Sequence, residues 1–179
     1  MDEEAYPAAR ASHQQEFWVA IQVRPRTEIA VARHLKNKGY EEFLPTYTRS
    51  LHRIKYAVNA EAPLFPGYVF CKYKQDCSGP RIVTTPGVIR ILGTPGRPAA
   101  VSDHEISAIR AVLNAGLTCR PERSPRVGQS VRITSGPLEG VVGTVARIRN
   151  SCRLILCVGL LRRAVSVEIA SEAVAAWSP

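Results

Sequence analysis

Hydrophobic and polar positions in the first part of the chain change between strand and helix periods. Residues 17–23, FWVAIQV, form an apolar, β-branched run that predicts a buried strand. The next segment has apolar residues at helical spacing and reaches Gly39, which suits a helix C-terminus. We expect this helix to have an apolar face of Ile29, Val31, Ala32 and Leu35.

Three further segments predict two more strands and a polar excursion between them. Residues 41–62 begin as a strand and continue as a basic excursion, and residues 63–74 predict a second strand. Alternation in that strand places Val69 and Cys71 on its inward side. Residues 84–94 predict a turn followed by a short strand.

A second helix is predicted over the segment VSDHEISAIRAVLNAG. Ser102 and Glu105 have the spacing of a capping box, and Gly116 ends the pattern. Its apolar face consists of Ile106, Ile109, Val112 and Leu113. The element order predicts an α+β fold, in which an antiparallel sheet carries the helices on one face.

The pattern changes beyond this helix. Residues 117–126 contain two prolines and three arginines with little apolar content, so they predict an interdomain linker. Residues 127–179 consist of short β-branched runs punctuated by glycine, which predict a small barrel of about five strands. The expected organisation is therefore a polar extension (1–16), a first domain (17–116), the linker and a barrel domain.

Composition narrows the class of protein. The hydrophobic fraction of 45% allows a packed core, and no apolar run is long enough to span a membrane. The polar N-terminus lacks a signal sequence, so we expect a cytoplasmic protein. The net charge of +9, concentrated in residues 17–113, favours nucleic acid or another polyanion, although solubility alone would also explain it.

Reactive side chains do not form a recognisable catalytic or metal site. The five cysteines include no CxxC pair, which favours buried free thiols over zinc or disulfides. The four histidines lie in unrelated contexts, and TPGRPA lacks the lysine and the setting of a phosphate loop. We therefore predict no enzyme activity, no cofactor and no metal.

Two segments indicate binding instead. The stretch PLFPGYVF combines an inward-facing half with aromatic residues that lead into Lys72 and Lys74, which favours a protein interface over a purely internal strand. The basic excursion interleaves Arg49, Arg53 and Lys55 with tyrosines. That mixture suits a nucleic-acid backbone, and a solvated hairpin tip is an equal alternative.

The segment GPLEGVVG predicts a tight turn between strands. Gly136 begins the turn with Pro137, and Gly140 and Gly143 permit a sharp bend and a close backbone approach. Together with the preceding VGQSVRI, the segment resembles the KOW motif of transcription and ribosomal proteins. This resemblance implies a five-stranded barrel.

The motifs taken in order resemble the NusG family of bacterial transcription elongation factors. They are FWVAIQVRPRTE, LFPGYVF, TTPGVIRILG with GRPAAVSDHEI, and VGQSVRITSGPLEGVVG, and they cover about residues 17–170. The segments LKNKGYEEFLPTY and EAPLFPGYVF are similar to the specialised UpxY- and RfaH-type antiterminators. The first domain is then expected to be of the NGN type and the second of the KOW type.

The resemblance implies that the first domain binds RNA polymerase and suppresses pausing. The clamp helices of the β′ subunit would contact a patch that maps onto Phe65, Pro66, Tyr68 and Phe70, with Gln22 at its edge. The gate loop of the β subunit would contact the segment from Ser78 to Arg81. Non-template DNA would lie near Arg49, Arg53 and Lys55. A monomer is expected.

The resemblance also implies that the second domain recruits Rho or a small-subunit ribosomal protein, through Leu138, Leu160 and Leu161. RfaH-type second domains can form a helical hairpin that masks the polymerase-binding patch. Glycine, proline and β-branched residues between Val131 and Val145 favour the barrel here. The alternative function is an RNA- or ribosome-associated KOW protein.

Overall fold

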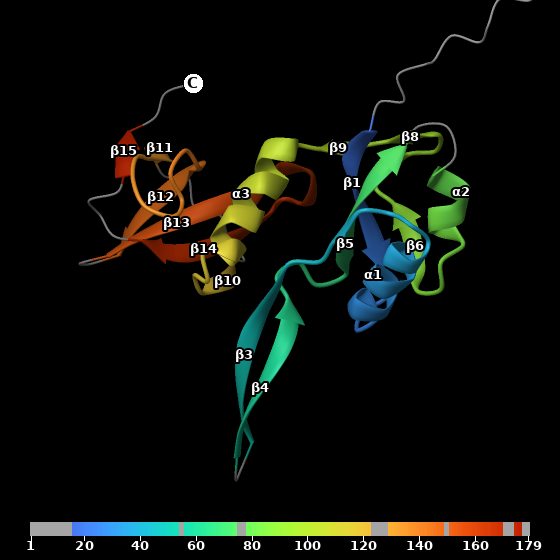
Figure 1. The fold of residues 1–179 in the computed structure, drawn as a ribbon, viewed down its shortest axis with the longest axis horizontal. Coiled ribbons are helices and arrows are strands. Elements are labelled where there is room, and N and C mark those ends of the chain that lie inside the picture. The colour runs from blue at the N-terminus through green and yellow to red at the C-terminus, as the bar shows by residue number, and fades with distance from the viewer. Residues whose placement is uncertain are drawn as a thin grey trace, which may run out of the picture.

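The computed structural model describes residues 16–53, 56–74, 78–122, 129–148, 151–169 and 174–176. Two antiparallel sheets dominate these residues, and three helices pack around the first sheet. The α+β prediction is therefore confirmed. Figure 1 shows the two sheets side by side, with a long two-stranded ribbon projecting away from both.

The first sheet has the strand order β2-β5-β1-β6, and β9 pairs with β1 beyond the end of β6. Its elements and the small hairpin beside it are β1 (Glu16–Val23), α1 (Glu28–Asn37), β2 (Glu42–Phe43), β5 (Tyr68–Lys74), α2 (Ser78–Val83), β6 (Val88–Ile91), β7 (Gly93–Thr94), β8 (Arg97–Pro98), β9 (Ala100–Val101) and α3 (Asp103–Asn114). The central pairing aligns Val19 with Cys71 and Ala20 with Phe70.

Helices cover both faces of this sheet, so the prediction that they lie on one face is wrong. Helices α1 and α2 contribute Val31, Leu35 and Ile82 to one apolar cluster, together with Val69 and Cys71 of β5. Helix α3 belongs to a different cluster on the opposite face (Figure 1). The sequence pattern shows that a helix has an apolar face, but it does not show which side of a sheet receives that face.

The helix boundaries follow the predicted signals. Gly39 adopts a φ of 84° and Gly116 a φ of 68°, each two residues after the end of its helix, α1 or α3. The Ser102 side chain accepts a hydrogen bond from the backbone N–H of His104 at 3.2 Å and so caps α3. The face of α1 differs from the prediction, because Ile29 is 49% exposed and Glu28 is 5% exposed.

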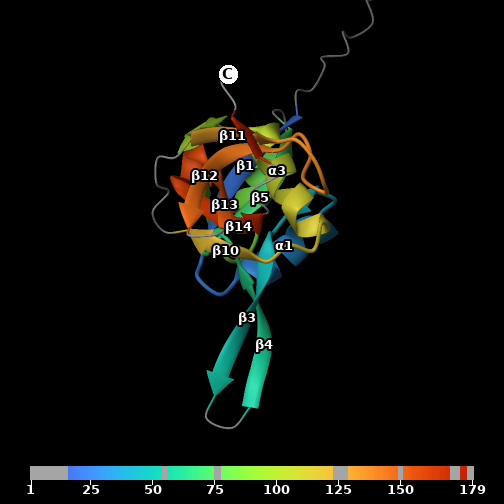
Figure 2. The ribbon, with the colours of Figure 1, turned by 90° about the vertical axis from the view of Figure 1, so that its left-hand side faces the viewer.

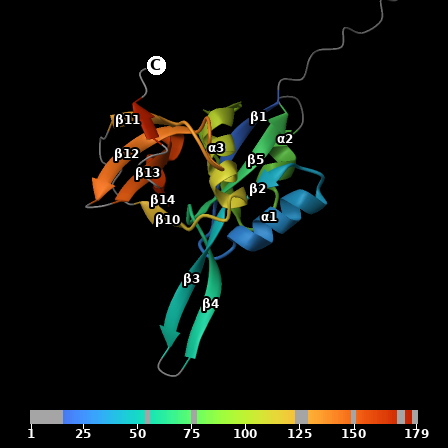
Figure 3. The same cartoon turned by 60° about the vertical axis from the view of Figure 1, so that its left-hand side comes forward.

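The basic excursion forms the ribbon that Figure 2 shows from the side. Strands β3 (Thr46–Arg53) and β4 (Tyr56–Pro63) pair along their whole length, from Thr46 opposite Pro63 to Arg53 opposite Tyr56. The ribbon pairs with neither of the two large sheets. It projects away from the two sheets (Figure 3).

The second sheet has the order β10-β14-β13-β12-β11-β15. Its strands and one short helix are β10 (Cys119–Glu122), β11 (Gln129–Ile133), β12 (Val142–Ile148), β13 (Ser151–Val158), η1 (Gly159–Leu161), β14 (Arg163–Ile169) and β15 (Val174–Ala176). The β form predicted for this domain is confirmed. Part of the predicted linker is a strand, because β10 pairs with β14 and buries Cys119.

Candidate functional site

The predicted patch begins in a tight turn between β4 and β5. The backbone N–H of Tyr68 donates to the carbonyl of Phe65 at 3.1 Å, with Pro66 and Gly67 between them. Gly67 adopts a φ of 85°. Proline followed by a residue of positive φ is the pattern of a type II turn, and glycine adopts that φ without steric cost.

An aromatic row crosses the sheet next to this turn. The ring centroids of Phe65 and Phe70 are 5.5 Å apart, those of Phe70 and Phe43 are 6.2 Å apart, and those of Phe43 and Trp18 are 6.4 Å apart. The guanidinium of Arg110 on α3 lies 4.8 Å from the Trp18 ring centre and 4.9 Å from that of Phe43. We call the four rings of Trp18, Phe43, Phe65 and Phe70 the aromatic row.

Three rings of the row are buried and Phe43 is partly buried, which corrects the expectation that the patch faces outward. Phe65 is 1% exposed and Phe70 is 0% exposed, whereas Pro66 is exposed and Tyr68 is half-buried. Both phenylalanines belong to an apolar cluster that continues into the second sheet. Strand alternation assigns Phe70 correctly to the side opposite Val69, but it does not reveal that another domain covers that side.

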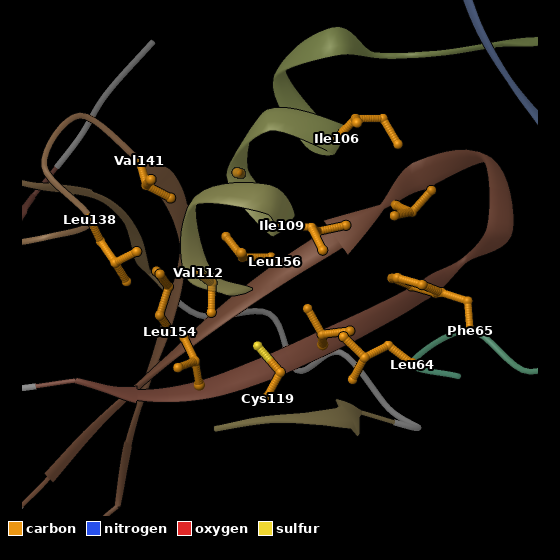
Figure 4. Packing of buried hydrophobic residues seen from close by; sticks show 14 of the residues in the cluster. Leu64, Phe65, Ile106, Ile109, Val112, Cys119, Leu138, Val141, Leu154 and Leu156 are labelled. Atoms are coloured by element: carbon orange, nitrogen blue, oxygen red, sulfur yellow. The ribbon is translucent and has the colours of Figure 1, made fainter. Parts of the chain in front are cut away.

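The second domain lies directly over the turn. In Figure 4, Leu64 and Phe65 approach the strands of the second sheet, and α3 packs on the same strands through Ile109 and Val112. The Arg163 guanidinium donates to the carbonyl of Pro66 at 2.7 Å. The same guanidinium lies 4.9 Å from the centre of the Tyr68 ring.

A second polar contact between the domains involves the N-terminus of α3. The Glu105 carboxylate accepts a hydrogen bond from the backbone N–H of Gly159 at 3.0 Å. The predicted capping box is therefore formed on one side only, because Ser102 caps the helix while Glu105 contacts the other domain.

Sequence reasoning missed four residues that organise this region: Glu28, Glu105, Arg110 and Arg163. Glu28 is buried, and its carboxylate accepts a hydrogen bond from the Gly67 N–H at 2.9 Å. A charged residue at a helical position next to the apolar face is the signal that could have found Glu28. Glu105 carries a capping-box signal that assigns it a different partner, and Arg110 and Arg163 carry no local signal because their partners are distant in the chain.

The remaining predicted residues of the first domain lie outside the aromatic row. Gln22 of β1 is paired with Tyr68 of β5, and its half-buried side chain accepts a hydrogen bond from Arg90 Nε at 2.9 Å. Ser78 and Arg81 lie on α2, where Arg81 is exposed. On the ribbon, Arg49 is exposed and Arg53 occupies the last paired position of β3, while Lys55 lies outside the described residues.

In the second domain the predicted partner surface is divided. Leu138 is 3% exposed and points into the core in Figure 4, so in this structure it is unavailable to a partner. Leu160 is 36% exposed, and Leu161 packs partly against the shared cluster. Gly136 and Gly140 adopt positive φ, and a Cβ at Gly143 would lie 2.8 Å from a Leu154 side-chain carbon, so a side chain would be strained at the first two positions and crowded at the third.

Two of the free cysteines in the described part of the chain, Cys71 and Cys119, are buried. Burial raises the pKa of Cys71 to about 12, with a smaller contribution from Glu42 and Glu41. Burial also raises the pKa of Cys119 to about 11. Cys157 is exposed.

Among the described residues, no helix is long and apolar enough to cross a membrane.

Comparisons with known proteins agree on one family. The family model described as "Transcription termination factor nusG" matches residues 16–110. The "Transcription termination/antitermination protein NusG" of Vibrio vulnificus (strain CMCP6) is 32% identical over 165 residues, which cover 85% of this chain and 91% of that protein. The protein of the same name from Escherichia coli O6:H1 is 29% identical over 165 residues, with the same coverage.

A solved structure shows that the fold is shared as well. "Domain interaction in Thermotoga maritima NusG" matches with a TM-score of 0.54 and 18% identity, over 92% of this chain and 98% of that chain. The matched length includes both sheets described above. The chain belongs to the NusG family of transcription termination and antitermination factors.

Proposed function

We propose that this chain binds RNA polymerase through the face of its first domain that carries the aromatic row. Binding would favour the elongating conformation of the polymerase over the paused one, so the chain acts through a conformational equilibrium. The clamp helices of the β′ subunit are the proposed contact of this face, and the gate loop of the β subunit that of α2. The specialised antiterminator branch remains a prediction from the sequence resemblance.

The observation that carries the proposal is the way in which the aromatic row is covered. Four neighbouring rings lie on one sheet face, and α3 together with a separate domain closes over them. At the Phe65 end of the row, the second domain contacts the first through the hydrogen bond from Arg163, whose side chain is exposed, to the Pro66 carbonyl. An apolar surface buried under a neighbouring domain resembles an interface in composition, and a partner of similar chemistry can replace that domain.

Binding in this mode requires the second domain to leave the row. The free energy of closure then reduces the apparent affinity for polymerase by the fraction of molecules that are open. The second domain covers the row as a β-sheet structure, so this masking does not require a helical hairpin. Opening would also free the second domain to recruit Rho or a ribosomal protein, with the exposed Leu160 as the first candidate contact.

The ribbon is the proposed contact for exposed non-template DNA. Arg49 is exposed on β3, and Arg53 lies opposite Tyr56 near the end of the ribbon. A two-stranded ribbon of this kind can follow a nucleic-acid backbone, and its arginines would release counterions on binding.

The test is binding of the full chain to purified RNA polymerase core, together with a pausing assay. Tyr68→Ala removes a rim residue without opening the sheet core, and we expect affinity to fall about tenfold or more. Ile89→Ala is the matched control, because Ile89 is 51% exposed on β6 and lies outside the row. Wild-type affinity for Tyr68→Ala would refute the docking face. Absence of polymerase binding by wild type, with binding to RNA or ribosomes, would favour the alternative function.

A further inference from the structure

The Pro66–Gly67 peptide group is held from both ends by charged side chains. Its N–H, on Gly67, donates to the Glu28 carboxylate at 2.9 Å. Its carbonyl, on Pro66, accepts from the Arg163 guanidinium at 2.7 Å. An anion at the N–H and a cation at the carbonyl both favour the same orientation of the peptide dipole, so each strengthens the hydrogen bond at the opposite end.

Glu28 and Arg163 differ in the domain to which they belong and in their exposure to solvent. Glu28 is part of α1 in the first domain and is 5% exposed, so it stays beside the turn whether or not the second domain is present. Arg163 belongs to β14 of the second domain, and its side chain is exposed. Glu28 is therefore the permanent holder of this peptide and Arg163 is an exchangeable one.

Orientation of the central peptide is what separates the two common turn types. A type I turn has this peptide rotated by about half a turn from its type II orientation. Such a rotation would point the Gly67 N–H away from Glu28 and the Pro66 carbonyl away from Arg163. The Gly67 carbonyl also accepts from the Val23 N–H at 2.9 Å, which fixes the second half of the turn to β1.

We propose that Glu28 is a positioning residue for the turn from Phe65 to Tyr68, which we call the docking turn. Its buried carboxylate holds the Pro66 carbonyl outward, next to the Tyr68 ring, as an acceptor for a guanidinium. Arg163 occupies this acceptor when the domains are closed, and an arginine side chain of the bound partner occupies it when they are open. This inference rests on the proposed function only for the identity of the partner, because the closed state supplies its own test.

The variants Glu28→Ala and Glu28→Gln separate positioning from charge. Glu28→Ala removes the acceptor, so the Gly67 amide should lose its protection from hydrogen exchange. The open-to-closed ratio should rise about tenfold, as expected for a hydrogen bond to a charged group. The polymerase affinity of the open state, which is the apparent affinity divided by the open fraction, should fall by a similar factor. Glu28→Gln keeps an acceptor oxygen of the same reach, so it should retain Gly67 protection and most of both other quantities.

Arg163→Met should change the apparent polymerase affinity in a different way. It removes the second domain's hydrogen bond to the Pro66 carbonyl, so the open-to-closed ratio should rise, and the apparent affinity should rise with it. Gly67→Ala is an independent route to a misoriented turn, because the native φ of 85° is strained for alanine although a Cβ there meets only the Val23 carbonyl at 3.9 Å. It should change closure and affinity in the same directions as Glu28→Ala, even if Glu28→Ala itself fails to fold.

The readouts keep the two proposals apart. Hydrogen exchange of the full chain by NMR reports the turn, and spin-label distances between α1 and β13 report closure, both without polymerase. Native protection of Gly67 in Glu28→Ala, or normal closure in both Glu28→Ala and Gly67→Ala, would overturn the inference. An open-state polymerase affinity that is reduced equally in Arg163→Met and Glu28→Ala would also overturn it. Absence of polymerase binding by every variant, wild type included, would refute the proposed function alone.

Discussion

The two faces of the first sheet are equally buried but are covered by different kinds of structure. On one face Val19, Ile21 and Val69 are fully buried under α1 and α2, which belong to the same domain. On the other face Ala20 and Phe70 are as fully buried, under α3 and the second domain. Burial alone therefore does not distinguish a permanent core from an interface that is occupied by the chain itself.

The chemistry at the edges of the two faces does distinguish them. The face under α1 consists mainly of aliphatic side chains and is closed by elements a few residues away along the chain. The face under the second domain carries the aromatic row and is bordered by single polar contacts, from Arg163 and from Glu105. Contacts of that kind are individually weak, since exposed hydrogen bonds and cation–π pairs contribute about 0.5 to 1.5 kcal/mol each.

The largest expected effect comes from the same truncation made on each face. Leu35 and Leu64 are 0% and 1% exposed, on opposite faces of the sheet. Leu35→Ala should lower the free energy of unfolding by about 2–5 kcal/mol and leave the domains closed, because it leaves a cavity in a permanent core. Leu64→Ala should cost less on urea unfolding and should lengthen spin-label distances between α1 and β13. Equal costs with no opening in either variant would remove the distinction between the faces.

A smaller effect is expected from pH, with one thiol in each cluster. The folded-state pKa of Cys71 is about 12 and that of Cys119 about 11, above the ordinary value near 8.5. An unfolded chain releases these protons first, so stability is complete below about pH 8.5 and falls as pH rises toward the folded-state values.

Replacement by alanine removes this dependence, and its constant cavity cost does not affect the slope. Cys71→Ala should reduce the slope of the unfolding free energy against pH by at most about 1.4 kcal/mol per pH unit. Cys119→Ala should act over a narrower range, because its pKa is lower. If the slope for Cys119 is absent while that for Cys71 persists, the cover on the second face is mostly open.

The smallest expected effect concerns the N-terminus of α3. Glu105→Ala removes the hydrogen bond to Gly159, so the open-to-closed ratio should rise by a factor of about 2 to 10. Asp103→Ala is the control, since it removes a carboxylate from the same first turn of α3. Both variants lose a similar helix-dipole interaction, and Glu105→Ala also loses the hydrogen bond from the second domain. Equal opening in the two variants would show that Glu105 acts through helix stability.

The predicted strands, helices and turn glycines follow from local signals in the sequence. Alternation places Val69 and Cys71 inward, and Gly39 and Gly116 follow the helices they were expected to end. Most of the first-domain architecture was accessible in this way, because period and capping depend on residues close in the chain.

The errors concern contacts between distant parts of the chain. Glu28 is buried and Ile29 is exposed, because the Gly67 N–H in the turn of Phe65 to Tyr68 donates a hydrogen bond to the Glu28 carboxylate. The hydrophobic pattern of the sequence does not reveal this donor. Phe65 and Phe70 were expected outside because their neighbours are lysines, yet another domain covers them. The proline- and arginine-rich residues before position 123 were expected to be a linker, but β10 pairs with β14 there.

The position of β10 has a consequence for how the cover competes with any partner. Only residues 115–118 separate the end of α3 from the start of β10, and four residues span at most about 14 Å. A second domain released from the aromatic row therefore stays beside it, at an effective concentration on the order of millimolar. Under the proposed function, dilution of the protein does not weaken this competition, because the competitor is part of the same molecule. A partner displaces the second domain by binding the row tightly or by being held close to it through another contact. A higher concentration of this protein does not change the open–closed equilibrium within each molecule.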